Sequence, residues 1–170
     1  MTTAELRGLQ APLKERYRNE PGSAIMTLRA KGDLAAQGVT CKVETGRGLI
    51  VAGLHPATGG DGTAACAGEM LLEALAGCAG VTLRAVATAL AIPVRGGTVT
   101  VEGDLDFRGT LAVSKEAPVG FKEIRLQFDL DSDASAEQIE TLVKLTKRCC
   151  VVYQTLASPP PIELEIKKAL

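Results

Sequence analysis

The sequence contains very few aromatic residues and almost no histidine. Its 170 residues include no tryptophan, three phenylalanines, two tyrosines and one histidine, and the formal net charge is −1. Without a basic excess or stacking aromatics, the composition argues against a nucleic-acid-binding protein. A single histidine excludes sites that need two, such as the HExxH zinc motif and the three-histidine zinc cage.

We expect neither a secretory nor a membrane-spanning segment. The first ten residues, MTTAELRGLQ, contain no apolar core of signal-peptide length. Glu73 and Arg84 interrupt the most apolar stretch, residues 70–92. The uncharged run between them is much shorter than the about 20 residues that a membrane span needs. We therefore predict a cytoplasmic protein without membrane contact, in which residues 70–92 belong to a buried central helix.

Five cysteines stand out against these absences. A chain of this length buries about 70% of its unfolded surface without the help of disulfides. In a reducing cytosol, cysteines remain thiols that are buried, metal-binding or reactive. A zinc site built from Cys66, Cys78, Cys150 and His55 is conceivable, but no CxxC or HxxxH spacing supports it. We expect no metal and no cofactor.

The hydrophobic pattern predicts an α+β fold. Residues 1–20 form an N-terminal extension with a short helix, and residues 21–170 form one domain. Three strands are expected over residues 24–30, 39–45 and 49–52, separated by turns at 31–33 and 46–48. A long helix over residues 64–91 follows and ends before Pro93.

Alternating residues predict two further strands, at 98–107 and 121–130. Ser135 and Gln138 form a capping box that opens a second helix, which leads to Cys149 and Cys150. A last strand is expected at residues 162–166. The element order indicates mostly antiparallel sheets. Because the long helix is apolar nearly all round, we expect a homodimer in which two such helices bury each other.

Two of the cysteines lie on core-facing helices and could meet. Cys78 lies between Gly77 and Gly80, which indicates close packing by another helix or access for a small substrate. Cys150 follows Cys149 and a basic pair of residues, and positive charge lowers the pKa of a thiol. Such thiols would form a peroxidatic and resolving pair, unless they are small residues of the core.

The remaining candidates have simpler explanations. Cys66 opens the long helix, where a thiol gains acidity, but we interpret Cys66 and Cys41 as packing residues. Glu69 and Glu73 share one helix face, where they favour the helix dipole or could orient a cationic group near Cys78. His55, in a glycine-rich loop, could contact a substrate or be solvated.

The segment GEMLLEALAGCAGVTL, together with the later CCVVYQTL, resembles the OsmC/Ohr family of bacterial thiol-dependent peroxidases. The resemblance extends from about residue 23 to residue 167. It implies an intertwined α+β homodimer, with mostly antiparallel sheets around two long central helices. It also implies active sites at the subunit interface.

The resemblance assigns roles to individual residues. It makes Cys78 the peroxidatic cysteine and Cys150 the resolving cysteine. Glu69 matches the acidic position of the OsmC-like branch, and Arg29 and Arg47 are the candidates for an arginine that holds the thiolate. Two positions depart from the family pattern: Gly68 stands where characterised peroxidases have a catalytic glutamate, and Val151 replaces the usual proline after the second cysteine.

The implied function is reduction of organic hydroperoxides in oxidative-stress defence. An external dithiol, lipoyl-type or thioredoxin-like, would then regenerate the thiols. The two departures leave an alternative, a slow or non-catalytic module that senses redox state or binds a small ligand in the same pocket. The thiol pKa separates the two hypotheses, because an inert pocket predicts a value near or above about 8.5 and a peroxidase a lower one.

Overall fold

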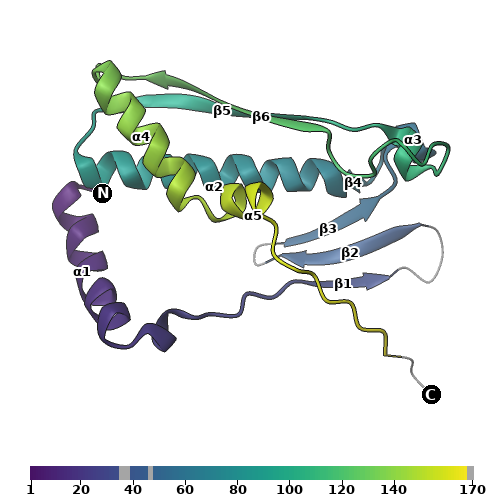
Figure 1. Ribbon diagram of the computed structural model, residues 1–170, viewed down its shortest axis with the longest axis horizontal. Coiled ribbons are helices and arrows are strands. Elements are labelled where there is room, and N and C mark those ends of the chain that lie inside the picture. Colours follow the sequence, from purple (N-terminus) through teal and green to yellow (C-terminus); the bar gives the residue numbers. More distant parts are fainter. Residues whose placement is uncertain (35–38, 46–47, 168–170) are drawn as a thin grey trace.

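The computed structural model describes residues 1–34, 39–45 and 48–167. The other helices and strands lie around one long central helix, α2, as Figure 1 shows. The elements are α1 (Thr3–Asn19), β1 (Lys31–Leu34), β2 (Thr40–Thr45), β3 (Gly48–Gly53), β4 (Ala65–Cys66), α2 (Ala67–Leu90), β5 (Gly96–Asp104), α3 (Phe107–Thr110), β6 (Glu123–Asp131), α4 (Ala136–Cys149) and α5 (Val151–Ala157), with short 3₁₀ turns at Pro21–Ala24 and Pro56–Thr58.

Helix α2 is the axis against which the rest of the core packs. Its buried residues, Leu75, Ala79, Leu83 and Ala87, recur at every fourth position and so form one stripe. The helix contacts β5 and helices α4 and α5. By length and composition α2 could also cross a membrane, a test that core helices of soluble proteins pass as well. Within this chain only the stripe of Leu75, Ala79, Leu83 and Ala87 is buried.

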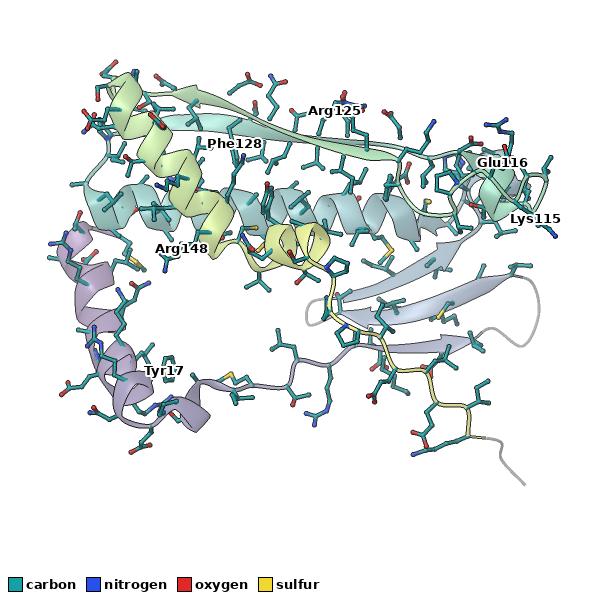
Figure 2. All side chains as sticks on the ribbon, viewed as in Figure 1. Tyr17, Lys115, Glu116, Arg125, Phe128 and Arg148 are labelled. Atoms are coloured by element: carbon teal, nitrogen blue, oxygen red, sulfur yellow. The ribbon has the colours of Figure 1, made fainter. Side chains whose placement is uncertain are left out.

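A two-stranded antiparallel sheet, β5 and β6, covers one side of α2. The register extends from the pair Gly96 and Asp131 to the pair Asp104 and Glu123. Since successive side chains of a strand point to opposite faces, the alternating sequence buries one face only. Figure 2 shows the result on β6, where Phe128 points toward the helices and Arg125 points away from them.

A second sheet precedes α2 and sets where that helix begins. Its order is β1-β2-β3-β4, with antiparallel pairing except between β3 and the two-residue strand β4. Strand β4 leads directly into α2, and Cys66 is the residue that precedes the first helical turn. The mixed α+β architecture with mostly antiparallel sheets agrees with the predicted fold class.

Helix α1 caps the other end of α2. The Thr3 hydroxyl donates to the Thr88 carbonyl at 2.7 Å, and the Arg7 guanidinium donates to the Ala89 carbonyl at 2.9 Å. The last carbonyls of a helix have no partner within the helix itself. The N-terminal extension therefore satisfies acceptors at the C-terminal end of α2.

Two predicted strands were wrong. Residues 25–30 form no strand, and β1 begins at Lys31, where the sequence predicted a turn. Strand β2 pairs with β3 on one side and with residues 31–34 on the other. Residues 25–30 therefore pair with no strand of the described chain. Residues 162–166 also form no strand: Ile162, Leu164 and Ile166 are 92%, 83% and 83% exposed. The second predicted turn falls partly on residues 46–47, which lie outside the described residues.

The core predicts a clear effect of shortening one side chain of α4. Leu142 is fully buried and packs with Leu83, Ala87 and Ile92. We expect Leu142→Ala to lower the free energy of unfolding by about 2–5 kcal/mol, because a cavity remains. Chemical denaturation at fixed protein concentration measures this change. Leu9→Ala, at a residue that is 61% exposed on α1, is the control. An equal effect of the two substitutions would contradict the assigned core.

Candidate active site

Cys150 lies where one helix ends and the next begins. It terminates α4 and is the N-cap residue of α5, with an extended backbone (φ −75°, ψ 111°). Because the chain breaks here, the first N–H groups of α5 have no partner within their own helix. One of them, the Tyr153 N–H, donates to Cys150 Sγ at 3.4 Å.

Other donors from this helix start reach Cys78 on α2. The backbone N–H groups of Val151 and Val152 hydrogen-bond to Cys78 Sγ. The hydroxyl of Thr82, one turn further along α2, is a third donor, and the Cys150 thiol is a fourth. The packing of α5 against α2 thus surrounds one sulfur atom with hydrogen-bond donors.

These contacts separate the acidities of the two thiols. Burial raises the pKa of Cys78, but the hydrogen bonds from Val152, Cys150, Val151 and Thr82 outweigh it, so that the pKa falls below its ordinary value. Burial raises the pKa of Cys150, and the neighbouring charge of Cys78 raises it further against the opposing N–H of Tyr153. Of the two thiols, Cys78 is therefore the more acidic and loses its proton first.

The three neighbouring cysteines differ in access. Cys78 is half-buried, Cys150 is fully buried and Cys149 is exposed, and all three are free thiols. Cys150 is the one that hydrogen-bonds to Cys78. The arrangement can form a Cys78–Cys150 disulfide after oxidation of the accessible sulfur, without a role for Cys149.

Glu69 does not lie beside Cys78. Nine positions along an α-helix amount to two and a half turns and about 13 Å, which places the two side chains on opposite faces of α2. Glu69 instead lines a shallow groove with Glu73 and Thr100. The resemblance suggested that the Glu69 carboxylate supports the Cys78 thiolate. Within one chain, this carboxylate lies on the β5 side of α2.

Of the two predicted arginines, the structure describes only Arg29, and no interaction found in the described residues joins it to the thiol pair. Arg29 is exposed in the segment before β1, and Arg47 lies outside the described residues. Backbone amides and Thr82 stabilise the thiolate in the described chain, and the sequence reasoning missed them. Two signals were present: Thr82 is four positions after Cys78, and Val151 has an N–H that a proline would lack.

The two glycines beside Cys78 have different surroundings. A Cβ on Gly80 would lie 3.3 Å from Val99 Cγ2, so this glycine allows β5 to approach the helix closely. A Cβ on Gly77 would meet nothing within 4 Å. Close packing is thus found at Gly80, although the neighbour is strand β5 and not the expected helix, and access of a substrate past Gly77 stays a prediction.

His55 and the two other cysteines occupy the loop and sheet before α2. The His55 ring stacks on Phe107 with centroids 5.0 Å apart, and its Nδ1 accepts the Ala57 N–H at 3.0 Å. Cys41 lies in β2 and Cys66 in β4, both half-buried. Among the residues that the structure describes, no three His, Cys, Asp or Glu side chains are grouped to hold a metal ion.

Comparison with known proteins identifies relatives by family and by fold. The family model described as OsmC-like protein matches residues 60–165. An OsmC-like protein from Mycoplasma pneumoniae superposes with a TM-score of 0.65 at 18% identity, over 79% of this chain and 89% of that chain. No curated protein matches the sequence.

Two similar structures have names that refer to hydroperoxide resistance. An organic hydroperoxide resistance protein OsmC from Legionella pneumophila has a TM-score of 0.60 at 23% identity, over 79% of this chain and 92% of that one. An organic hydroperoxide resistance protein from Elizabethkingia anophelis has a TM-score of 0.62 at 15% identity, over 80% and 91%. At these identities the likeness establishes the fold.

The N–H of Val151 provides a direct test of the thiolate site. Val151→Pro removes this donor, so we expect the pKa of Cys78 to rise and its alkylation near neutral pH to slow several-fold. Proline suits the first position of a helix, and the extended backbone of Cys150 suits a residue before proline. The pH dependence of iodoacetamide labelling at Cys78 measures the change.

Val151→Ala is the matched control for this substitution. It shortens the same side chain and keeps the N–H, so we expect the Cys78 labelling profile to stay that of the unmodified protein. If alanine and proline shift the profile equally, the side chain and not the amide sets the acidity of Cys78.

Proposed function

The chain belongs to the OsmC-like protein family, and on that premise we propose that it is a cytoplasmic thiol-dependent peroxidase that reduces organic hydroperoxides. Cys78 is the peroxidatic and Cys150 the resolving cysteine of this proposal. The observation that carries it is the paired arrangement of the two thiols, in which one has a lowered and the other a raised pKa. Peroxidatic chemistry favours a lowered pKa at the attacking cysteine, because the thiolate is the nucleophile.

In the proposed first step, Cys78 Sγ attacks the terminal oxygen of a hydroperoxide, the one that carries the hydrogen. The S–O bond forms as the O–O bond breaks, the alkoxide takes up a proton and leaves as an alcohol, and Cys78 becomes a sulfenic acid. The N–H groups of Val151 and Val152 and the Thr82 hydroxyl, which hold the thiolate, remain near the sulfur. The surrounding donors supply the electrostatic support that arginine was expected to give.

In the second step, the Cys150 sulfur attacks the sulfenic acid and releases water. The Cys150 proton leaves with the departing hydroxyl, and the product is a Cys78–Cys150 disulfide. An external dithiol, of lipoyl or thioredoxin-like chemistry, then supplies two electrons and restores both thiols. Since Cys150 is fully buried, Cys78 offers the more accessible sulfur for this exchange.

The alternative is a slow redox sensor or ligand-binding module on the same fold. It derives support from Gly68, which stands where characterised peroxidases of the family have glutamate. The lowered pKa of Cys78 favours the peroxidase instead, because an inert pocket gives no reason for four donors around one sulfur. The names of the Legionella and Elizabethkingia proteins also support hydroperoxides as the substrate class.

We also propose that the active protein is a homodimer whose interface passes beside the thiol pair. Val81, on the same face of α2 as Cys78, is 72% exposed, and Val151 is 68% exposed. Further exposed apolar side chains lie in the segment before β1 and in the C-terminal tail, namely Ile25, Met26, Leu28, Ile162, Leu164 and Ile166. Apolar surface of this extent marks an interaction site, and a second copy is the simplest partner.

Catalysis tests the roles of the cysteines. We expect Cys78→Ser to abolish turnover of cumene hydroperoxide with a dithiol reductant, because no nucleophile remains. Cys150→Ser should react once and accumulate Cys78 sulfenic acid, and Cys149→Ser should retain turnover because its side chain is exposed and away from the pair. A coupled assay and mass spectrometry give the readouts. Turnover by Cys78→Ser protein equal to that of the unmodified protein would refute the peroxidase proposal.

The oligomeric state tests the dimer separately. We expect a dimer in sedimentation velocity at micromolar concentration, and a shift toward monomer on Val81→Glu, since a charge would be buried at an apolar interface. Val113→Glu, at an exposed valine 72% accessible in the segment after α3, is the control. A monomer for the unmodified protein would contradict the proposed interface.

A further inference from the structure

An apolar groove made of two neighbouring hollows lies between β6 and helices α4 and α5. It consists of a hollow of about 240 Å³ and a second one of about 270 Å³. Ile124, Leu126 and Tyr153 line both hollows, so that the two are direct neighbours. Each hollow is close to the lower size limit of small-molecule sites.

The groove is separate from the surroundings of Cys78. Cys150 and Ala79 line the first hollow, and Leu156 and Ala157 line the second. Cys78 lines neither hollow. A molecule in the groove would therefore contact the buried side of Cys150 and leave the accessible side of Cys78 free.

The charge along the groove is confined to the first hollow. Lys147 of α4 is the only charged residue among the described residues that line either hollow. Its side chain is exposed, and none of the ion pairs formed by residues 1–34, 39–45 and 48–167 includes it. The remaining lining is almost wholly apolar, and the hydroxyls of Thr146 and Tyr153 are the exceptions. The Thr146 hydroxyl already donates a hydrogen bond to the Leu142 carbonyl at 2.7 Å.

We propose that this groove binds an aliphatic carboxylate of medium chain length. The chain lies against Ile124, Leu126 and Tyr153, and the carboxylate pairs with the ammonium group of Lys147. Burial of the chain provides most of the affinity, while the single cation selects an acid over the corresponding neutral alcohol. This site goes beyond the peroxidase proposal and does not depend on it.

Titration calorimetry with octanoate and with 1-octanol tests the proposal on the unmodified protein. We expect saturable binding of octanoate that is about tenfold tighter than that of 1-octanol, since a charge-assisted hydrogen bond is lost with the alcohol. Lys147→Gln should weaken octanoate binding by a similar factor. Lys144→Gln removes the same charge from a residue of α4 that lines neither hollow, and should leave binding unchanged.

Three outcomes would overturn the assignment of the groove. The first is no binding of octanoate at millimolar concentration, which would mean that a second copy of the chain or another segment covers the groove. The second is equal affinity for the acid and the alcohol, and the third is an equal effect of the Lys147 and Lys144 substitutions. Cys78→Ser protein, which lacks the proposed nucleophile, should bind octanoate normally, so that failure of the peroxidase proposal leaves this test intact.

Discussion

The break between α4 and α5 is the constraint on which the thiol site depends. An unbroken helix would use its amides internally, but the extended backbone at Cys150 frees the N–H groups of Val151, Val152 and Tyr153. The Val151 N–H acts on Cys78, the Tyr153 N–H acts on Cys150, and the Val152 N–H acts on both. The same break that turns the chain therefore brings backbone donors to both sulfur atoms. The Thr82 hydroxyl and the Cys150 thiol act in addition on Cys78 and make it the more acidic of the two.

Helix α2 provides the rigid support for this arrangement. Its buried stripe divides into a cluster of Leu83 and Ala87 with Leu142, and a cluster of Leu75 and Ala79 with Cys150. The first cluster anchors α4, and the second holds the start of α5 against the helix that carries Cys78. Cys150 thus has two roles, because it is a fully buried core residue and also the hydrogen-bond partner of Cys78.

Much of this fold was predictable from local sequence signals. The capping box of Ser135 and Gln138 is present, and the long helix, β2 and β3 and the alternating strands β5 and β6 occur close to the predicted ranges. Residues 25–30 and 162–166 show the limit of such signals, because a strand also needs a neighbour to pair with and alternation does not reveal one. The helical repeat could have placed Glu69 on the face opposite Cys78. Backbone donors to Cys78, by contrast, depend on a tertiary contact between α2 and α5.

The central claim is that Cys78 is the more acidic thiol of the pair and Cys150 the less acidic one. Alkylation of the unmodified, reduced protein over a range of pH, with each cysteine quantified separately by mass spectrometry, tests it most directly. The structure predicts that Cys78 is labelled with a midpoint below the ordinary value of a cysteine, about 8.5, and that Cys150 is labelled only at higher pH. Labelling of Cys150 before Cys78, or a midpoint for Cys78 at or above the ordinary value, would contradict it.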